Sequence, residues 1–481
     1  MTSLRKSFIS GFFWSILGQG GHLLIYLFAS IILARILTPY EFGQIGIVMF
    51  FINISRVFTE SGLSGALIRK QDATEDDFST VFVFNLVISV LLTVGIIAAS
   101  GPISEFYNNN DLQSILIALS FVLIINAFQF TQNAKIVKNL KFRRQAIYNF
   151  SATLVSSAAA VVLAYLGFGV WSLVIMQLLN AAVLTTLYWV FEGPSGQFLF
   201  KSNSFRQLYK FGLYTTLASL INTAFDNIYS LVLGKYFAIQ QTGLYYQAKK
   251  LQEIPVNIIK SSTLGVVFST LSRLQDSRKE FDDFYTRIVT SFTVLVGLIC
   301  ILIYIYAEQA ILLLYGEQWV GAVFYMKILV LGSFFYMQEM FNRVLFKVFD
   351  KTEKILTLEI IKVAIRSISI VYGVVEMDII ILLYGFLVTS IISYFINYFY
   401  SRKVYRSFSW EELITTIKVA ATGGFVIYVY QVTGSFLEVS MWLSFSFLPL
   451  ILLIYFVLLR VFKVFNVIGD TKVFLKVIKK K

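Results

Sequence analysis

Twelve ionisable side chains lie well inside the apolar stretches of this 481-residue chain. One charge at the centre of a membrane helix costs about 2.5–3.5 kcal/mol, so twelve charges facing lipid would cost on the order of 30–40 kcal/mol. They must therefore pair with one another or line a wet cavity. The set contains seven cations and five anions, and full pairing leaves positive charge over, which suits an anionic passenger such as a phosphate or pyrophosphate. Its members are Arg56, Glu60, Asp226, Lys249, Lys250, Glu253, Lys260, Lys327, Glu339, Glu359, Lys362 and Arg366.

The spacing of these charges places several of them on common helix faces. Arg56 and Glu60 are four residues apart, so they share a face and can pair. Glu359, Lys362 and Arg366 step by three and four residues along one face of a later segment. Each of these groups could be a structural ion pair or part of a binding site, and the spacing alone leaves both readings open.

A third group of charges lies between residues 249 and 260. Lys249, Glu253 and Lys260 step by four and seven residues along one face, and Lys250 lies beside them. After full pairing within the set of twelve, no acid is left to neutralise the excess lysines, so we expect a cationic site for an anionic substrate. The predicted substrate-binding residues are Arg56, Lys249, Lys250, Lys260, Lys362 and Arg366.

Carboxylates in apolar segments are candidates for coupling to a proton or sodium gradient. Asp226 lies in the middle of one segment, with Asn222 four residues before it and Asn227 beside it, so we expect a lone buried carboxylate among amides. Pairing with a lysine of the next segment is the alternative. Glu60 and Glu359 are the other candidates. Cys300 is the single cysteine, which excludes an internal disulfide and a cysteine metal cluster, and we expect no cofactor and no metal.

The elements that must position these charges are apolar segments of helical length. The composition is 57% hydrophobic and only 14% charged, with a mean hydropathy of +0.75. A hydrocarbon core of about 30 Å needs about 20 apolar residues to cross it. We predict an all-α polytopic membrane protein with about fourteen transmembrane helices, of which the first is a retained helix rather than a cleaved leader. The segments are 11–34, 41–67, 79–101, 112–133, 147–167, 169–191, 211–234, 243–271, 285–306, 320–342, 355–375, 379–400, 413–433 and 441–461.

Lysine and arginine are distributed very unevenly between the two sets of loops. The termini and the loops on their side hold 30 of the 40 basic residues, whereas the opposite loops hold two, Arg35 and Lys235. The positive-inside rule therefore places both termini in the cytoplasm. The same rule accounts for the net charge of +13. We therefore do not expect a nucleic-acid partner.

The chain repeats itself at an offset of about 200 residues. Arg35 and Gly43 correspond to Lys235 and Gly243, and the run Asp-Asp-Phe recurs with a short insertion. A six-helix repeat keeps its orientation in the membrane, so we expect two lobes related by an axis along the membrane normal. The predicted domains are residues 1–200 and 201–406, one six-helix lobe each, and 407–481, two extra helices with a basic tail.

Several stretches of the chain resemble polysaccharide-exporting flippases. They are LARILTPYEFG at 33–43, SGLSGALIRK at 61–70, DFSTVF at 77–82, GLYYQA at 243–248, LSRLQD at 271–276 and GEQW at 316–319. Together they resemble the Wzx-type, WzxC-like branch of the multidrug/oligosaccharidyl-lipid/polysaccharide (MOP) exporter superfamily. One departure is Phe268-Ser269, where the family often has Phe-Pro. The family has no sharp catalytic motif, so no residue roles carry over.

The resemblance implies a flippase that carries undecaprenyl-pyrophosphate-linked oligosaccharide across the bacterial inner membrane by alternating access. Such a transporter serves O-antigen, capsule or exopolysaccharide synthesis, and its partners are membrane lipids and polysaccharide polymerase or assembly proteins. A MATE-like antiporter for cationic drugs is one alternative, although the surplus of cations argues against it. A membrane polymerase or ligase needs a sizeable outer loop, and these loops are short, so we do not expect an enzyme. A scaffold for an assembly complex is a third alternative.

Overall fold

The computed structural model is built from α-helices, and the residues that it describes contain no β-strand. These residues are 20–60, 63–70, 72–194, 198–351, 353–405, 410–437 and 444–464, with side chains except at 210–215, 218, 261–263, 265, 266 and 434–437. The first nine residues of predicted segment 11–34, residue Ser61 and the basic tail after residue 464 lie outside the described residues.

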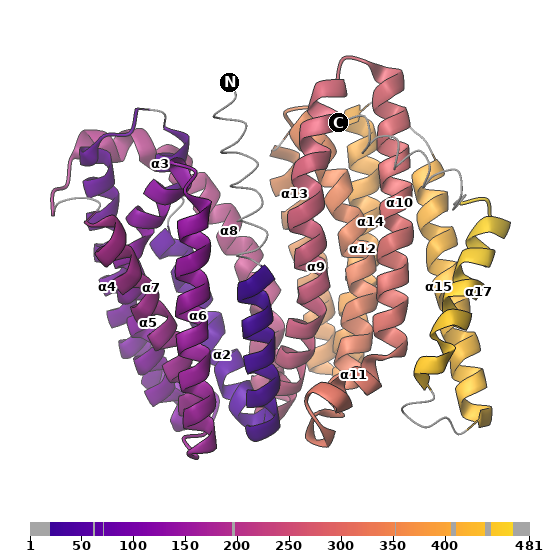
Figure 1. The fold of residues 1–481 in the computed structure, drawn as a ribbon, viewed down its shortest axis with the longest axis horizontal. Helices are drawn as coiled ribbons and strands as arrows, with labels where there is room; N and C mark the ends of the chain where they lie inside the picture. Colours follow the sequence, from indigo (N-terminus) through magenta and orange to yellow (C-terminus); the bar gives the residue numbers. More distant parts are fainter. Residues whose placement is uncertain are drawn as a thin grey trace. The chain divides into compact units, whose positions relative to one another are not determined.

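Each predicted apolar segment coincides with helix in the described structure, which confirms the all-α class (Figure 1). The three longest helices exceed the predicted segments by 7 to 11 residues because polar turns at their ends continue the helix. The helices are Gly20–Ile36, α2 (Pro39–Glu60), α3 (Leu63–Arg69), α4 (Glu75–Phe106), α5 (Asp111–Lys138), α6 (Phe142–Tyr165), α7 (Val170–Glu192), α8 (Ser202–Tyr236), α9 (Ile239–Leu274), α10 (Arg278–Ile305), α11 (Ala307–Leu314), α12 (Ala322–Val348), α13 (Glu353–Val375), α14 (Ile379–Tyr405), α15 (Glu411–Leu437) and α17 (Leu448–Val461).

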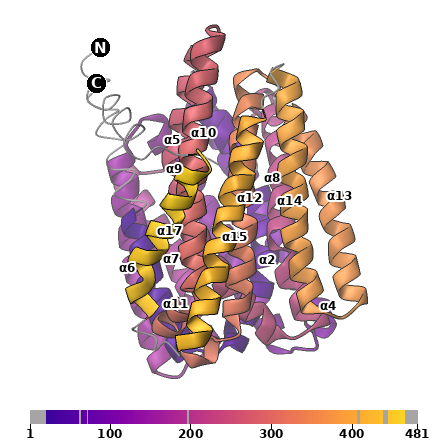
Figure 2. The same ribbon diagram turned by 90° about the vertical axis from the view of Figure 1, so that its right-hand side faces the viewer.

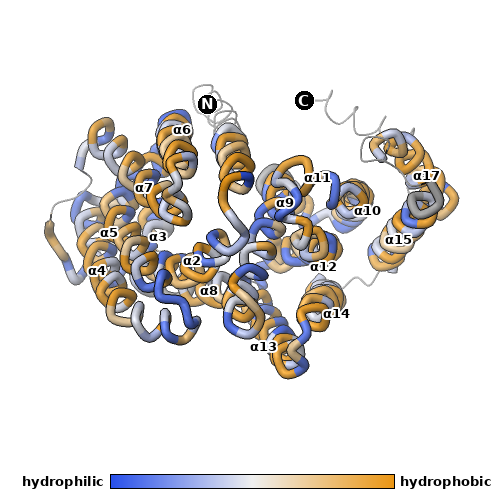
Figure 3. Tube along the Cα trace, turned by 90° about the horizontal axis from the view of Figure 1, so that it is seen from below, coloured by the Kyte–Doolittle hydropathy of each residue, from blue (hydrophilic) through white to orange (hydrophobic). Residues whose placement is uncertain are grey.

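Many of these helices are long and apolar enough to cross a membrane (Figure 3). In the described part of the chain eight segments meet that condition, and Gly20–Ile36 and Phe445–Val461 are shorter apolar helices. Helices α8, α9, α12 and α13 are equally long but carry charged residues among the apolar ones. The chain is therefore a multi-pass membrane protein, and fourteen crossings remain a prediction.

Local sequence sets where two of the long helices begin. At α2, the backbone N–H of Thr38 donates to Glu41 Oε2 at 2.7 Å, and Pro39 occupies the first helical position. At α4, the Thr74 side chain accepts from the backbone of Asp77, whose carboxylate accepts in return. Both are capping boxes, which satisfy orphan N–H groups of the first turn.

The helices form two compact units, each with its own packing. Unit 1 comprises Met1–Gln247 with Tyr315–Gln318, and unit 2 comprises Ala248–Leu314 with Trp319–Lys481. In unit 1, α4 packs on α5, α6 on α7 and α2 on α8. In unit 2, α12 and α13 both pack on α14, and α10 packs on α12 and α15. The predicted boundaries follow the sequence repeat rather than this packing, and they remain a prediction.

The repeat is visible in the backbone at the ends of equivalent helices. Leu140 follows α5 with φ 54°, and Asp350 follows α12 with φ 51°. Gly167 follows α6 with φ 83°, and Met377 follows α13 with φ 52°. Both pairs are 210 residues apart, and each residue ends its helix in a left-handed turn whose next N–H bonds back five residues. The helical repeat thus extends through α13, further than the sequence matches indicated.

The two C-terminal helices belong to unit 2 and run side by side (Figure 2). Gly297 of α10 allows their approach, because a Cβ there would lie 2.5 Å from Val419 of α15 and 2.9 Å from the Tyr455 hydroxyl of α17. That hydroxyl donates to the Val294 carbonyl oxygen at 2.7 Å. The two C-terminal helices are therefore packed on α10.

Candidate functional site

Four charged side chains of α12 and α13 form a buried cluster in unit 2. Lys362 Nζ lies 3.1 Å from Glu339 Oε1 and 3.1 Å from Glu359 Oε2, and Arg343 also contacts both carboxylates. The side chains of Glu339 and Glu359 are only 2% and 6% exposed. Each cation thus bridges both acids, and the cluster as a whole is neutral. Complete pairing is what makes four buried charges tolerable in a medium of low dielectric constant.

The cluster confirms one part of the sequence analysis and corrects another. Glu359 and Lys362 share a face, as their spacing predicted. However, Lys362 was expected to contribute surplus positive charge, and two carboxylates neutralise it. Arg343 was missed because it lies one residue beyond the predicted segment 320–342. Its spacing of four from Glu339 was the signal that could have identified it.

Arg366 lies one helical turn beyond Lys362 on α13. Its guanidinium lies over the ring of Phe386 on α14, with 5.7 Å between the guanidinium carbon and the ring centroid. A cation over an aromatic face keeps its charge while it is partly removed from water. Arg366 thus contacts α14 through Phe386, whereas the four-residue cluster joins α12 to α13.

The predicted lysines of α9 lie on a helix that continues through Pro255. Lys249 Nζ is 3.6 Å from Glu253 Oε1, so two residues of the predicted face form an ion pair. Lys250 is half-buried, and Lys260 is exposed. The described residues of unit 2 therefore hold five of the six predicted substrate-binding cations.

The remaining predicted residues lie in unit 1. Arg56 Nε is 3.4 Å from Glu60 Oε1, which confirms the predicted pair, and the two side chains are 46% and 53% exposed. Asp226 on α8 is exposed, so the expectation of a lone buried carboxylate at this position is wrong. Among the three candidates for ion coupling, Glu359 is buried, and Asp226 and Glu60 are exposed.

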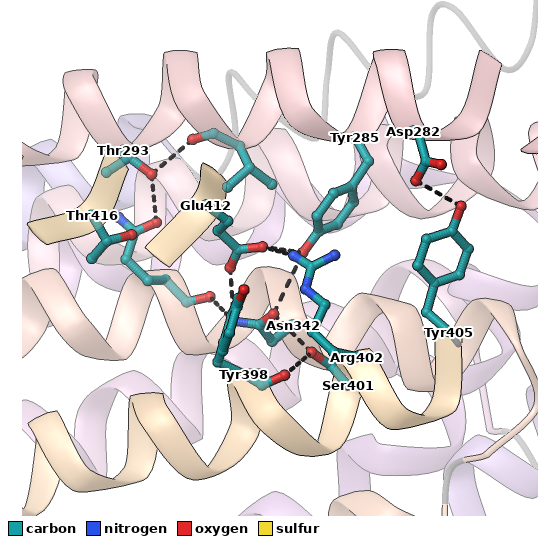
Figure 4. Close-up of polar contacts among 12 residues, drawn as sticks. Asp282, Tyr285, Thr293, Asn342, Tyr398, Ser401, Arg402, Tyr405, Glu412 and Thr416 are labelled. Atoms are coloured by element: carbon teal, nitrogen blue, oxygen red, sulfur yellow. Dashed lines mark hydrogen bonds and ion pairs between the residues drawn. The ribbon is translucent and has the colours of Figure 1, made fainter. Parts of the chain in front are cut away.

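A second buried network, which the sequence analysis missed, connects four helices of unit 2 (Figure 4). Glu412 in the first turn of α15 pairs with Arg402 of α14. It also accepts hydrogen bonds from Tyr285 Oη of α10 at 3.2 Å and from Asn342 Nδ2 of α12 at 3.1 Å. The Arg402 guanidinium lies over the ring of Tyr285 at 5.0 Å. Glu412 thus holds the C-terminal helix pair to three other helices.

Both clusters consist of ion pairs and hydrogen bonds between side chains of different helices. The described residues contain no group of three His, Cys, Asp or Glu side chains that could hold a metal ion. The signal for the second network was present in the sequence as two adjacent acids, Glu411 and Glu412, before an apolar run. Their role depends on Arg402 and Asn342, which come from other helices.

Comparison with solved structures identifies the fold. The structure described as "Lipid II flippase MurJ, inward closed conformation" superposes with a TM-score of 0.72 over 95% of this chain and 98% of that chain. The sequence identity is 15%, so the match establishes the fold. The chain therefore shares the fold of that solved structure over nearly its whole length.

Curated relatives extend the comparison to sequence. The succinoglycan biosynthesis transport protein ExoT of Rhizobium meliloti (strain 1021) is 24% identical over 309 residues, which cover 64% of this chain and 63% of that protein. The lipopolysaccharide biosynthesis protein WzxC of Escherichia coli (strain K12) is 24% identical over 330 residues, with 66% and 65% covered. The chain thus covers just under two thirds of the length of these relatives.

A family model gives the assignment for most of the chain. The model described as polysaccharide biosynthesis protein matches residues 32–324. This range contains α2 to α11 and the predicted cations of α2 and α9. The chain therefore belongs to the family of polysaccharide biosynthesis proteins.

Proposed function

We propose that this protein is a flippase that moves undecaprenyl-pyrophosphate-linked oligosaccharide units across the bacterial inner membrane by alternating access. The observation that carries the proposal is that a chain of the polysaccharide biosynthesis family has the fold of MurJ over nearly its whole length. The relative ExoT is described as a transport protein. The protein would serve O-antigen, capsule or other exopolysaccharide synthesis as a transporter and not as an enzyme.

The proposed contact with the pyrophosphate is made by cations outside the neutral cluster. We assign this role first to Arg366, whose guanidinium lies over the ring of Phe386, and to Lys250 and Lys260 of α9. Arg56 and Lys249 each have an acid one turn away, so they would contribute less net charge. Lys362 would act indirectly, by holding α13 in place through the cluster.

Ion coupling is assigned to Glu359. It is the buried member of the three candidates, and its carboxylate is shared between Lys362 and Arg343. A proton taken up by Glu359 would weaken both contacts and release positive charge beside Arg366. Charge release of this kind would link proton binding to binding of the anionic head group.

The proposed setting follows from the charge distribution. Thirty basic residues on the side of the termini support cytoplasmic N- and C-termini in the inner membrane. The lipid-linked oligosaccharide and membrane lipids are the direct partners. A polysaccharide polymerase or assembly protein on the opposite face would receive the product.

The test is depletion of the protein in its native host. Lipid-linked oligosaccharide is measured by mass spectrometry, and its leaflet is identified with a membrane-impermeant reagent. Complete units that accumulate on the cytoplasmic leaflet are the expected result. Single units on the outer leaflet would indicate a polymerase or ligase, and no accumulation would favour a drug antiporter or a scaffold.

A further inference from the structure

Unit 2 contains a cavity of about 340 Å³ next to the Glu412–Arg402 network. It lies among the first turns of α10, the last turn of α14 and the first turn of α15. Charged residues at the start of α10 are followed by an apolar stretch, so the cavity lies where a membrane helix passes from head groups into hydrocarbon. The residues that matter below are Asp282, Asp283, Thr286, Arg287, Thr290 and Glu411.

Three charged residues of the lining, Arg402, Glu412 and Asp282, are held in place by partners within the protein. Arg402 and Glu412 pair with each other, and Asp282 Oδ1 accepts a hydrogen bond from Tyr405 Oη at 2.8 Å (Figure 4). Glu412 also accepts from Tyr285 and Asn342. This part of the lining therefore keeps its shape, as a binding site requires.

The rest of the lining includes a row of polar side chains on α10. Asp283, Thr286, Arg287 and Thr290 line the cavity, and the side chains of these four make no hydrogen bond or ion pair with another described residue. Asp283 and Arg287 are one turn apart and both exposed, but they do not pair within 4 Å. A guanidinium, two hydroxyls and a carboxylate are thus available to a ligand in a preformed space.

The charge of the lining identifies the ligand chemistry. Carboxylates outnumber guanidinium groups by four to two, so a purely anionic head group would be repelled. Arg287 with Thr286 and Thr290 offers donors to one phosphate. Asp283 and Glu411 offer acceptors to an ammonium group nearby, and an ammonium with N–H donors suits them better than a quaternary amine.

We propose that this cavity binds phosphoethanolamine chemistry, supplied by the head group of a zwitterionic, amine-bearing phospholipid. The phosphate is held by Arg287 and the two threonines, and the ammonium by Asp283 and Glu411. The bound lipid bridges α10 and α15 and so stabilises attachment of the C-terminal helix pair. This site is independent of the transport substrate and of the proposed flippase activity.

The experiment uses the purified full-length chain and native mass spectrometry. The protein is equilibrated with phosphatidylethanolamine, phosphatidylcholine or phosphatidylglycerol of identical acyl chains. We expect retention of phosphatidylethanolamine at least about tenfold above the other two, and an increased thermal stability in that lipid alone. Because charge-assisted hydrogen bonds are strong, Arg287→Gln should weaken this retention by about tenfold. Lys279→Gln, at the same end of α10 but outside the cavity lining, is the matched control.

Equal retention of the three lipids, or retention that is unchanged in Arg287→Gln, would overturn the proposal. Soluble phosphoethanolamine provides the second arm. If soluble phosphoethanolamine gives the full thermal shift without any lipid, the cavity binds phosphoethanolamine as a free metabolite. The assignment to a phospholipid head group is then wrong. If Arg287→Gln does not fold, the lipid series with the unmodified protein still decides the question.

Discussion

Gly43 and Gly243 pack against each other in a reciprocal contact near the starts of α2 and α9. A Cβ atom on Gly43 would lie 2.0 Å from the carbonyl oxygen of Ile239, and one on Gly243 would lie 1.8 Å from that of Pro39. Both glycines and both carbonyls are 200 residues apart. The contact therefore joins equivalent positions of the two repeats, and no side chain larger than hydrogen fits there.

Alanine at Gly43 or at Gly243 should destabilise the protein by about 1–3 kcal/mol or more, because the added methyl group meets rigid backbone. The measurement is thermal unfolding of the purified protein in detergent. Gly95 of α4 is the control, since a Cβ there meets nothing within 4 Å. Gly95→Ala should be neutral or slightly stabilising. Equal losses at Gly43 and Gly95 would contradict the close contact.

Removal of the charge at Glu412 should cost about 3–5 kcal/mol, because it leaves Arg402 buried without its carboxylate. Chemical unfolding of Glu412→Gln measures this loss. The double substitution Glu412→Leu with Arg402→Met should recover much of it, since an apolar pair replaces two buried charges. A double variant as unstable as the single one would show that the ion pair is not the source of the loss.

Arg366 and Lys362 should respond differently to substitution. Arg366→Gln should reduce transport by about tenfold, while loss of its cation–π contact with Phe386 lowers stability by about 0.5–1 kcal/mol. Lys362→Met should lower the unfolding free energy by several times as much, because Arg343 would then be the one cation of the cluster beside two buried carboxylates. Flipping assays in proteoliposomes, run beside unfolding curves, separate the two effects. Unchanged transport by Arg366→Gln would remove Arg366 from the proposed site.

Replacement of Met377 by glycine should stabilise the folded protein. It has φ 52° at a position where the first repeat has Gly167, and the left-handed region costs a residue with a side chain about 1–2 kcal/mol. Met377→Gly should therefore raise stability by about 1 kcal/mol, and Gly167→Met should lower it by a similar amount. Both are measured as shifts in the thermal midpoint. A loss of stability in Met377→Gly would mean that its side chain contributes packing that outweighs the strain.

Apolar runs of helical length determined the helices, because burial of such runs in lipid leaves the backbone no other way to satisfy its hydrogen bonds. Spacing within one helix also determined which charges share a face. Arg56 with Glu60 and Glu359 with Lys362 were predictable, since residues three or four apart are always neighbours on a helix. The repeat was visible from a few collinear matches that included Gly43 and Gly243.

Only the tertiary structure decided which charges meet across helices. Arg343 of α12 contacts Glu359 of α13, and Arg402 of α14 contacts Glu412 of α15. These contacts depend on how each helix is rotated and shifted relative to its neighbour, which no local sequence pattern specifies. The same reason explains the error at Asp226, whose position within α8 said nothing about whether a neighbouring helix covers it. Sequence periodicity sets the faces of one helix, whereas packing of many side chains at once sets which faces meet.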